Sequence, residues 1–361
     1  MHRTTALKRP IVWIPIPLGL CFAAALLFFA GRGTTPAIRD DAGTPLSGSV
    51  ALLEKVELGG MDQWILIRGQ DSSNPILLWL HGGPGAPLMP VARHFIGGLE
   101  QDFVVVHWDQ RGAGKSNPPD FDEGTMTFRQ FFNDAHELTQ YLKKRFHRAS
   151  IYLVGHSWGT QLGLRLAEAY PEDYCAYVGI SQVVDPERAF RVSRTWLLER
   201  IRESGDSRAE ERLKEIGPAL NEDHEAFVRY INMIHTYGGD LDLSMARLLW
   251  IAVRAPEYRI NDLFAWLRGA NRGSGPMWRS PEYQSYNAIK QVPRLTVPAY
   301  FFCGRDDYNT PLEVTREYFE ILEAPNGKEL VVFEESAHTP FMAEPEKFNA
   351  ELLNVKRDTS Q

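Results

Sequence analysis

Short runs of consecutive apolar residues recur along the chain and predict buried β-strands. Runs without apolar–polar alternation suit strands that helices cover on both faces of a sheet. They are PILLWL (75–80), FVVVHW (103–108), SIYLVG (150–155), CAYVGIS (175–181), PAYFFCG (298–304) and KELVVFE (328–334). Before them, SVALLEKVEL and MDQWILIRG flank Gly59-Gly60 and predict a β-hairpin.

Segments with helical spacing of apolar residues lie between these strands. One stripe comprises Phe131, Ala135, Leu138, Leu142 and Phe146. Other helices are predicted for the segment that ends near Pro171, for residues 313–322 and after Pro345. Alternation of strand and helix predicts an α/β fold with a mostly parallel sheet.

The pattern changes between residues 185 and 292, where strand-like runs are absent. Helical candidates dominate there: RTWLLERI, AFVRYINMIHTY, MARLLWIAV and NDLFAWLRGA. The sequence therefore predicts a core formed by residues 49–184 and 293–361, with a helical cap inserted at 185–292.

The first residues differ in character from the rest. Residues 11–30 contain no charged side chain, and twenty apolar residues suffice for a helix to cross a bilayer core of about 30 Å. We expect residues 1–10 to be a cytoplasmic basic tail, 11–30 a transmembrane signal-anchor and 31–48 a linker, with the remainder exported. The alternative is a signal peptide that is cleaved, giving a secreted protein.

Composition excludes several classes of protein. With 39 basic and 46 acidic residues the net charge is −7, so no basic excess is available to bind a nucleic-acid backbone. The three cysteines, Cys21, Cys175 and Cys303, lack the paired short spacing of a zinc site. No Asn-x-Ser/Thr sequon occurs, which favours a bacterial envelope over a glycosylated lumen.

A candidate nucleophile follows the third apolar run. Gly155-His156-Ser157-Trp158-Gly159 fits the pattern G-x-S-x-G, with a predicted strand before it and a predicted helix after it. Glycines allow the sharp turn that lifts the Ser157 hydroxyl clear of the sheet. We predict Ser157 as the nucleophile.

A serine nucleophile needs a base and an acid that orients the base. His338 is the only histidine after His235 and follows a late strand, so it is the predicted base. Asp306 and Asp307 follow the preceding strand. We favour Asp307 as the acid, with Asp306 as the alternative.

The glycine-rich segment His81-Gly82-Gly83-Pro84-Gly85 ends an earlier strand. A loop at this place supplies the second oxyanion donor in such enzymes. We predict that the backbone N–H groups of Gly83 and Trp158 form the oxyanion hole. The chemistry requires a small-molecule or short-peptide substrate and water, with no metal and no cofactor.

These motifs together resemble the proline iminopeptidase branch of the α/β-hydrolases. They are HGGPG at 81–85, DQRGAGKS at 109–116, GHSWGT at 155–160, GRDD at 304–307 and the late His338, and the resemblance spans about residues 50–355. It implies a serine aminopeptidase that releases an N-terminal proline or another small residue. Many relatives in that branch are instead esterases or amide hydrolases for small molecules.

The sequence departs from this resemblance in its cap. Family aminopeptidases hold the substrate's ammonium with glutamates, one of them in a Trp-x-x-Trp-Glu stretch that is absent here. The candidate amine anchors are Glu199, Glu203, Glu225, Glu257 and Asp262. Two alternatives therefore stay open: a small-molecule esterase or amidase of the same fold, and a non-catalytic binding protein of the envelope.

Overall fold

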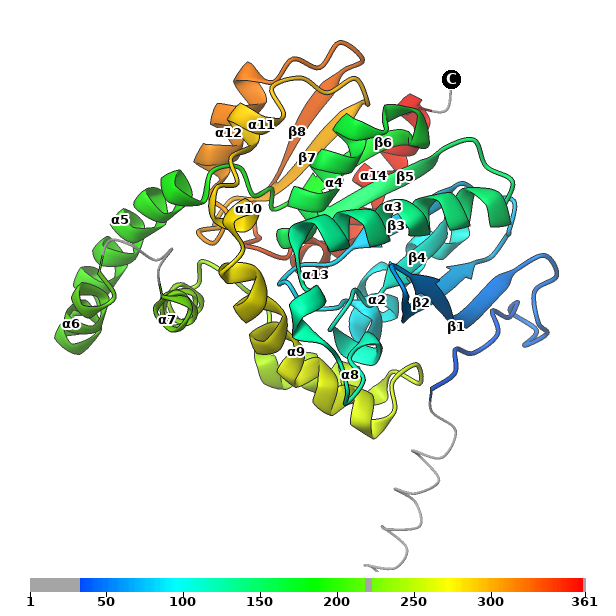
Figure 1. Cartoon of the computed structure of the whole chain (residues 1–361), viewed down its shortest axis with the longest axis horizontal. Helices are drawn as coiled ribbons and strands as arrows, with labels where there is room; N and C mark the ends of the chain where they lie inside the picture. The colour runs from blue at the N-terminus through cyan, green and yellow to red at the C-terminus, as the bar shows by residue number, and fades with distance from the viewer. Residues whose placement is uncertain (1–32, 218–222, 360–361) are drawn as a thin grey trace, which may run out of the picture.

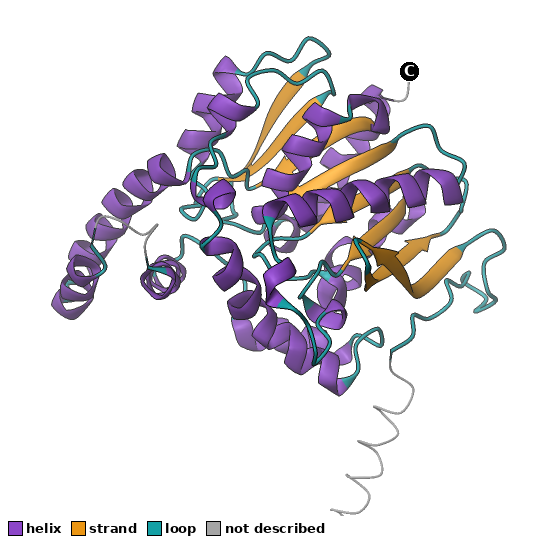
Figure 2. Cartoon of the chain, viewed as in Figure 1, coloured by secondary structure: helices purple, strands orange, loops and turns teal. Residues whose placement is uncertain are grey.

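The computed structural model describes residues 33–217 and 223–359. In these residues an eight-stranded sheet forms the centre of the molecule, with helices on both of its faces (Figure 1; Figure 2). The strand order is β1-β2-β4-β3-β5-β6-β7-β8. The strands are β1 (Val50–Leu58), β2 (Met61–Gly69), β3 (Ile76–Leu80), β4 (Val104–Trp108), β5 (Ile151–His156), β6 (Tyr174–Ile180), β7 (Ala299–Gly304) and β8 (Lys328–Phe333).

The predicted mostly parallel sheet is confirmed. Strands β1 and β2 form the predicted antiparallel hairpin around Gly59 and Gly60, both of which have positive φ. Strand β2 also pairs antiparallel with β4, and all remaining pairs from β4 to β8 are parallel. The carboxyl ends of the parallel strands therefore share one edge, where loops can bring distant residues together.

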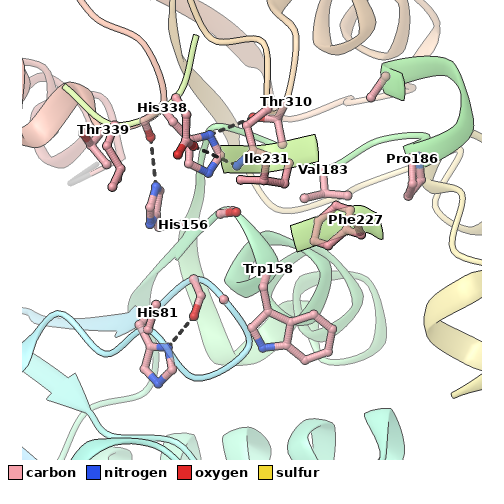
Figure 3. A pocket seen from close by; sticks show the side chains of 18 of the residues that line it. His81, His156, Trp158, Val183, Pro186, Phe227, Ile231, Thr310, His338 and Thr339 are labelled. Carbon is pink, nitrogen blue, oxygen red and sulfur yellow. Dashed lines mark hydrogen bonds between the residues drawn. The ribbon is translucent and has the colours of Figure 1, made fainter. Parts of the chain in front are cut away.

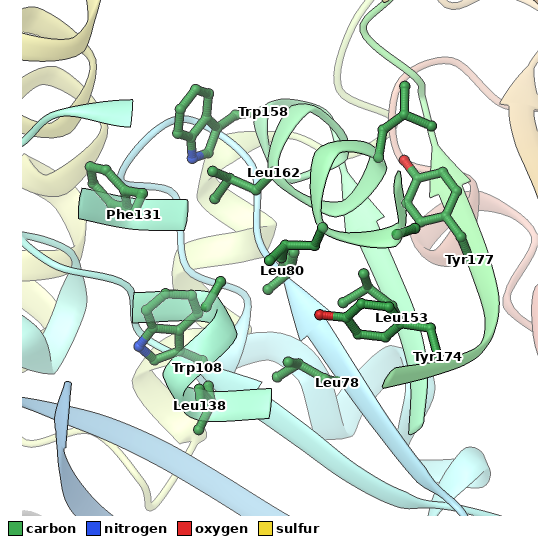
Figure 4. Close-up of a cluster of buried hydrophobic side chains, with 14 of the residues drawn as sticks. Leu78, Leu80, Trp108, Phe131, Leu138, Leu153, Trp158, Leu162, Tyr174 and Tyr177 are labelled. Carbon is green, nitrogen blue, oxygen red and sulfur yellow. The ribbon is translucent and has the colours of Figure 1, made fainter. Parts of the chain in front are cut away.

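Helices before and after the cap cover the two faces of the sheet. On one face α3 and α4 pack against the central strands, and Figure 4 shows Phe131 and Leu138 of α3 with Leu162 of α4 around Leu78 and Leu80 of β3. The other face is covered by α2, α13 and α14. The bounds are α2 (Met89–Ile96), α3 (Phe128–Arg145), α4 (Trp158–Ala169), α12 (Leu312–Ile321), α13 (Pro340–Ala343) and α14 (Pro345–Thr359).

A helical insert separates β6 from β7, as the sequence predicts. Helices α5, α6 and α7 pack around a small apolar cluster of their own. Residues Leu248 and Leu263 of α8 and α9 instead join the core beneath them. The inserted helices are α5 (Pro186–Ser204), α6 (Ser207–Glu215), α7 (His224–Thr236), α8 (Met245–Arg254), α9 (Ile260–Trp278), α10 (Pro281–Gln284) and α11 (Ala288–Gln291).

The loop after β4 connects the core to the cap helix α9. Asp109 is fully buried and accepts hydrogen bonds from the Tyr258 hydroxyl and the Lys115 N–H. The Lys115 ammonium in turn lies 2.6 Å from the Asp262 carboxylate on α9. In the same loop the Arg111 guanidinium forms a buried ion pair with Asp134 of α3. These polar contacts fix the loop between sheet and cap.

Of the linker predicted at 31–48, the first described residues contact the folded domain. The Gly33 N–H donates to the carbonyl of Pro256 at 2.7 Å, and the Thr35 hydroxyl donates to the Glu257 carboxylate at 3.0 Å. Within the described ranges no helix is long and apolar enough to cross a membrane. The predicted membrane segment at 11–30 lies outside them.

Candidate active site

The turn between β5 and α4 holds Ser157 in an unusual backbone conformation. Ser157 has φ 52° and ψ −120°, in a region that a non-glycine residue occupies only under strain. Its N–H donates to the carbonyl of Ile180 at the end of β6, at 3.0 Å. The strain is thus held by the neighbouring strand, and the side chain stands at the carboxyl edge of the sheet.

The two glycines of the G-x-S-x-G motif permit a close approach of helix and strands. A Cβ on Gly155 would lie 2.6 Å from the carbonyl oxygen of Gly159. A Cβ on Gly159 would lie 2.2 Å from the carbonyl oxygen of Leu80 in β3. Both distances are shorter than the non-bonded contacts that a Cβ atom makes in proteins, so only glycine permits this packing.

The structure brings His338 and Asp307 together from separate loops. Nδ1 of His338 lies 2.9 Å from Oδ2 of Asp307, and both side chains are almost fully buried. Oδ2 of Asp307 also accepts from the Thr310 hydroxyl at 2.7 Å, while Oδ1 accepts the N–H groups of Asn309 and Thr310. Asp306 is exposed, so only Asp307 contacts the imidazole.

A carboxylate of the cap organises the loop that carries His338. Asp242, between α7 and α8, accepts the N–H groups of Ala337 and Thr339 at 2.7 and 2.9 Å and also the Thr339 hydroxyl at 2.8 Å. The His338 N–H itself donates to the carbonyl of Asp240 at 2.8 Å. Three successive N–H groups of this loop are therefore bound by the cap.

The carbonyl of His338 is fixed from the core side. It accepts the Ser181 hydroxyl and Nε2–H of His156, each at 3.0 Å. Figure 3 shows the contact with His156. Burial and the neighbouring His338 lower the pKa of His156 to about 3, so its ring is neutral and serves as a positioning group.

The environment shifts the protonation equilibria of the Asp307–His338 pair in opposite directions. Burial would lower the pKa of His338, but the charge of Asp307, the hydrogen bond to it and the charges of Asp240 and Asp242 outweigh burial and raise that pKa. Burial would raise the pKa of Asp307, but the charge of His338 and the hydrogen bonds from His338 and Thr310 outweigh burial and lower that pKa. The pair therefore favours an ionised carboxylate beside a basic imidazole.

The predicted oxyanion donors lie on the same wall of the site as Ser157. Trp158 is the first residue of α4, so its N–H has no carbonyl one turn before it and points out of the helix start. A Cβ on Gly82 would lie 3.2 Å from the Cβ of Ser157, which places the glycine-rich loop against the nucleophile turn. Gly83 follows in that loop with φ 112°.

His81, at the start of the glycine-rich loop, is a structural residue. Its Nδ1 donates to the carbonyl of Gly82 at 2.8 Å, and its Nε2 accepts the Gln110 N–H at 3.1 Å. Burial lowers the pKa of His81 to about 4, so the ring remains neutral. It holds the two loops together rather than acting as a second base.

These groups line a cavity of about 670 Å³ between the core and the cap. Ser157, His338, Gly83 and Trp158 all contribute to its wall. Most of the remaining wall is apolar, and Figure 3 shows Val183, Phe227 and Ile231 among the residues that line it. Its size and lining suit a small organic substrate or the end of a short peptide.

Two of the four tryptophans in the predicted cap, residues 185–292, line the cavity. They are Trp266 and Trp278. Trp196 instead stacks on Tyr308 with ring centroids 4.0 Å apart, and Trp250 is exposed.

The carboxylates of the cavity differ from those considered as amine anchors. Glu199, Glu203 and Glu225 are exposed on α5 and α7. Glu257 pairs with Arg93, and Asp262 pairs with Lys115. All five lie in the described part of the chain, and the cavity wall contains none of them.

The cavity wall contains three other carboxylates from the insert. Asp185 caps α5 and accepts the amide of Asn287, and the Glu187 side chain is exposed and paired with Arg191. Asp240 is buried, with Oδ1 accepting the Asn309 amide at 3.0 Å. It is therefore the one buried carboxylate of this wall that serves no helix cap, among the residues described.

Sequence analysis missed Asp240 and Asp242. Both follow Gly238-Gly239 in a cap loop, nearly a hundred residues before the His338 loop that they contact. A turn signal with two aspartates gives no information about which distant loop those aspartates meet.

The fold, with a serine turn and a buried Asp–His pair at the carboxyl edge of a parallel sheet, defines an α/β-hydrolase architecture. The chain belongs to the alpha/beta hydrolase family, whose model matches residues 77–351.

Its relatives include proteins named as aminopeptidases. It is 34% identical over 311 residues to a probable aminopeptidase, YbaC, of Bacillus subtilis. The matched segment covers 84% of this chain and 96% of the relative. It is 26% identical to a proline iminopeptidase of Heyndrickxia coagulans, over 76% of this chain and 88% of that one. The resemblance stated from the motifs is thereby confirmed.

Solved structures share the fold at lower identity. A proline iminopeptidase-related protein from Thermus thermophilus superposes with a TM-score of 0.59 at 21% identity, covering 86% of this chain and 98% of the other. The proline iminopeptidase of Mycobacterium smegmatis gives a TM-score of 0.58 at 19% identity, over 85% and 98% of the two chains.

The dependence of the His338 loop on the cap can be measured by hydrogen exchange. Replacing Asp242 by alanine removes the acceptor for the N–H groups of Ala337 and Thr339. We expect amide exchange in residues 336–343 to accelerate about tenfold or more, as loss of hydrogen bonds worth ~1.5–3 kcal/mol implies.

Asp122→Ala is the matched control, because Asp122 caps an exposed turn remote from this loop. Equal exchange of residues 336–343 in both variants would show that the cap does not hold the loop.

Proposed function

We propose that the chain is a serine hydrolase that works through an acyl-enzyme, and that its substrates are short peptides or amides with a free N-terminal amine. The observation that carries the first part is the strained Ser157 turn beside the buried Asp307–His338 pair in one cavity. The second part rests on Asp240 and on relatives named as aminopeptidases.

Each group has a defined part in the proposed reaction. The Ser157 hydroxyl attacks the acyl carbon while Nε2 of His338 accepts its proton, and Asp307 holds Nδ1–H so that Nε2 is free. The N–H groups of Gly83 and Trp158 bind the negative oxygen of the tetrahedral intermediate. His338 then protonates the leaving amine, and water hydrolyses the ester by the reverse sequence.

Asp240 supplies a counter-charge for a substrate amine. Burial raises the pKa of this carboxyl group, and the charge of His338 and the hydrogen bond from Asn309 oppose that shift. A bound ammonium would favour the ionised form of Asp240 and satisfy its second oxygen, whose neighbour His235 lies at 3.9 Å. A charged amine is the group that compensates a buried carboxylate most effectively.

A small-molecule esterase or amidase is the second candidate. The apolar wall formed by residues such as Val183, Phe227 and Ile231 favours it, because an apolar acyl group needs no charged partner. A non-catalytic binding role would not need a strained nucleophile turn with a buried acid–base pair.

For location we propose that residues 11–30 anchor the protein in a membrane with the hydrolase domain exported, or that they act as a cleaved signal. The support is their uncharged sequence after Arg3, Lys8 and Arg9.

Three substrates separate the candidate functions. We expect hydrolysis of proline 4-nitroanilide, with little turnover of its N-acetylated twin, because only the free amine can pair with Asp240. Turnover of a short-chain nitrophenyl ester alone would overturn the peptidase assignment and favour the esterase.

Ser157→Ala is the control for the nucleophile. It should reduce kcat by about 10⁶-fold, since triad members act as a unit. Activity that survives in this variant would mean that Ser157 is not the nucleophile.

Asp240→Asn tests recognition of the amine. We expect kcat/KM for the free-amine anilide to fall about 10- to 100-fold, the value of a hydrogen bond to a charged group of ~1.5–3 kcal/mol. Turnover of the nitrophenyl ester should change far less, because the ester has no amine and the Asp240 charge reaches its hydrolysis only through the pKa of His338.

Asp185→Asn is the matched control, because it neutralises a carboxylate in the same wall while asparagine still caps α5. Equal losses in both variants, or equal losses on both substrates, would remove Asp240 as the amine partner.

Asp307→Asn tests the acid by its effect on pH dependence. The base form of His338 is neutral, and the Asp307 charge raises the pKa of His338, so the wild-type kcat/KM falls as pH decreases through that raised pKa. Without this charge the acid limb should move to lower pH, and kcat should fall about 10³- to 10⁴-fold.

Asp306→Asn, on the exposed neighbour, should leave both the rate and the profile unchanged. If Asp306→Asn gave the larger loss, the assignment of the acid would be reversed.

A further inference from the structure

Large apolar side chains are exposed on both α8 and α9. On α9, Ile260, Phe264 and Leu267 are spaced four and three residues apart, so they share one face of the helix, with exposed fractions of 42%, 56% and 44%. On α8, Met245 and Trp250 are 51% and 63% exposed. We call these five residues and the arginines that surround them the α8–α9 face.

The charge around these apolar residues is positive. Residues 245–269 contain four exposed arginines, and the Arg254 guanidinium lies over the Trp250 ring at 5.2 Å. The two acidic residues of this stretch, Glu257 and Asp262, face inward and pair with Arg93 and Lys115. The arginines are Arg247, Arg254, Arg259 and Arg268.

This local excess of base contrasts with a chain whose net charge is −7. Exposed aromatic and aliphatic residues bordered by arginine are the composition of helices that lie in a membrane interface.

The first described residue lies beside this face. Gly33 donates its N–H to the carbonyl of Pro256, in the loop that joins α8 to α9, and a Cβ on Gly33 would meet the Arg259 side chain. Figure 1 shows the start of the blue segment next to that loop. Three peptide units connect Gly33 to Ala30, the end of the predicted membrane segment, so the two are at most about 10 Å apart.

We propose that the α8–α9 face docks onto the surface of an anionic lipid bilayer, beside the segment predicted to cross it. A membrane segment that ends within about 10 Å of Gly33 places the loop around Pro256 at the depth of the lipid headgroups. The arginines then meet anionic headgroups, and Trp250, Phe264 and Leu267 reach the boundary with the acyl chains. The docking rests on the proposed membrane attachment and not on the proposed hydrolysis; the substrate class that it favours rests on both.

Docking in this orientation gives the cavity access to the lipid surface. Met245 and Leu267 belong to the α8–α9 face and also line the cavity. The substrate class that this arrangement favours is an amphiphilic amide or ester whose apolar part partitions into the bilayer, because such a molecule reaches the apolar wall without crossing water.

Spin-label accessibility in the full-length chain tests the docking. The chain is reconstituted in nanodiscs that contain phosphatidylglycerol, in a background with Cys21, Cys175 and Cys303 replaced by alanine. One variant carries a nitroxide at Phe264→Cys and the other at Ile321→Cys. Ile321 is the matched control, because it is an apolar residue 57% exposed on α12, outside the α8–α9 face.

We expect the label at position 264 to be several-fold more accessible to oxygen, which concentrates in lipid, and several-fold less accessible to a water-soluble nickel chelate than the label at 321. Equal accessibility at the two positions would overturn the docking and leave the anchor intact.

Two other results would also overturn the proposal. Protection of position 264 from both oxygen and nickel would mean that a second copy of the chain covers the face. A chain that does not remain with the nanodiscs would remove the anchor together with the docking. Since no readout uses activity, neither result bears on the hydrolase assignment.

Discussion

The geometry of the site depends on how closely α4 approaches the ends of β3 and β5. Gly159 meets the carbonyl of Leu80 at a distance that excludes a side chain, so the chain reverses direction within a few residues. Ser157 takes up the strain of this reversal in its positive φ. The same short turn leaves the start of α4 beside the serine, so the helix supplies an N–H group and its dipole where negative charge would develop.

The cap is part of the site and not only its cover. Asp240 and Asp242 bind three successive N–H groups around His338, so the position of the imidazole depends on the insert as well as on the sheet. A second connection joins Lys115 to Asp262 on α9. Since core and cap share these polar contacts, a change in the cap loop after α7 would alter the position of His338 as well as the cavity wall.

Local sequence determined most of the fold and the central part of the site. A strand that is buried on both faces consists of consecutive apolar residues, as in residues 103–108. It can be recognised in the sequence because apolar and polar residues do not alternate in it. The sharp turn at Ser157 was also predictable, because glycines flank this residue between a strand and a helix. The choice of Asp307 over Asp306 was supported only by position; the structure adds that Asp307 faces inward to Thr310 and His338.

What sequence could not give is the set of contacts between distant loops. The amine-anchor candidates proved exposed or paired with a cation, whereas the cavity wall carries Asp240, which the sequence did not single out. Residues 31–48 were predicted as a linker because they are small and polar, yet Thr35 makes contacts that local composition does not encode.

The contacts of Thr35 determine which parts of the domain would bear a mechanical force applied at its N-terminal side. The Thr35 hydroxyl lies between Glu257 of the cap and Arg68 of β2, and Arg68 also binds the carbonyl of Pro36. Strand β1, which follows in sequence, is one of the two edge strands of the described sheet and pairs with β2. Thr35 is hydrogen-bonded to both core and insert before the chain reaches that edge. A mechanical load applied at Gly33 therefore acts on core and insert together before it acts on the β1–β2 hairpin.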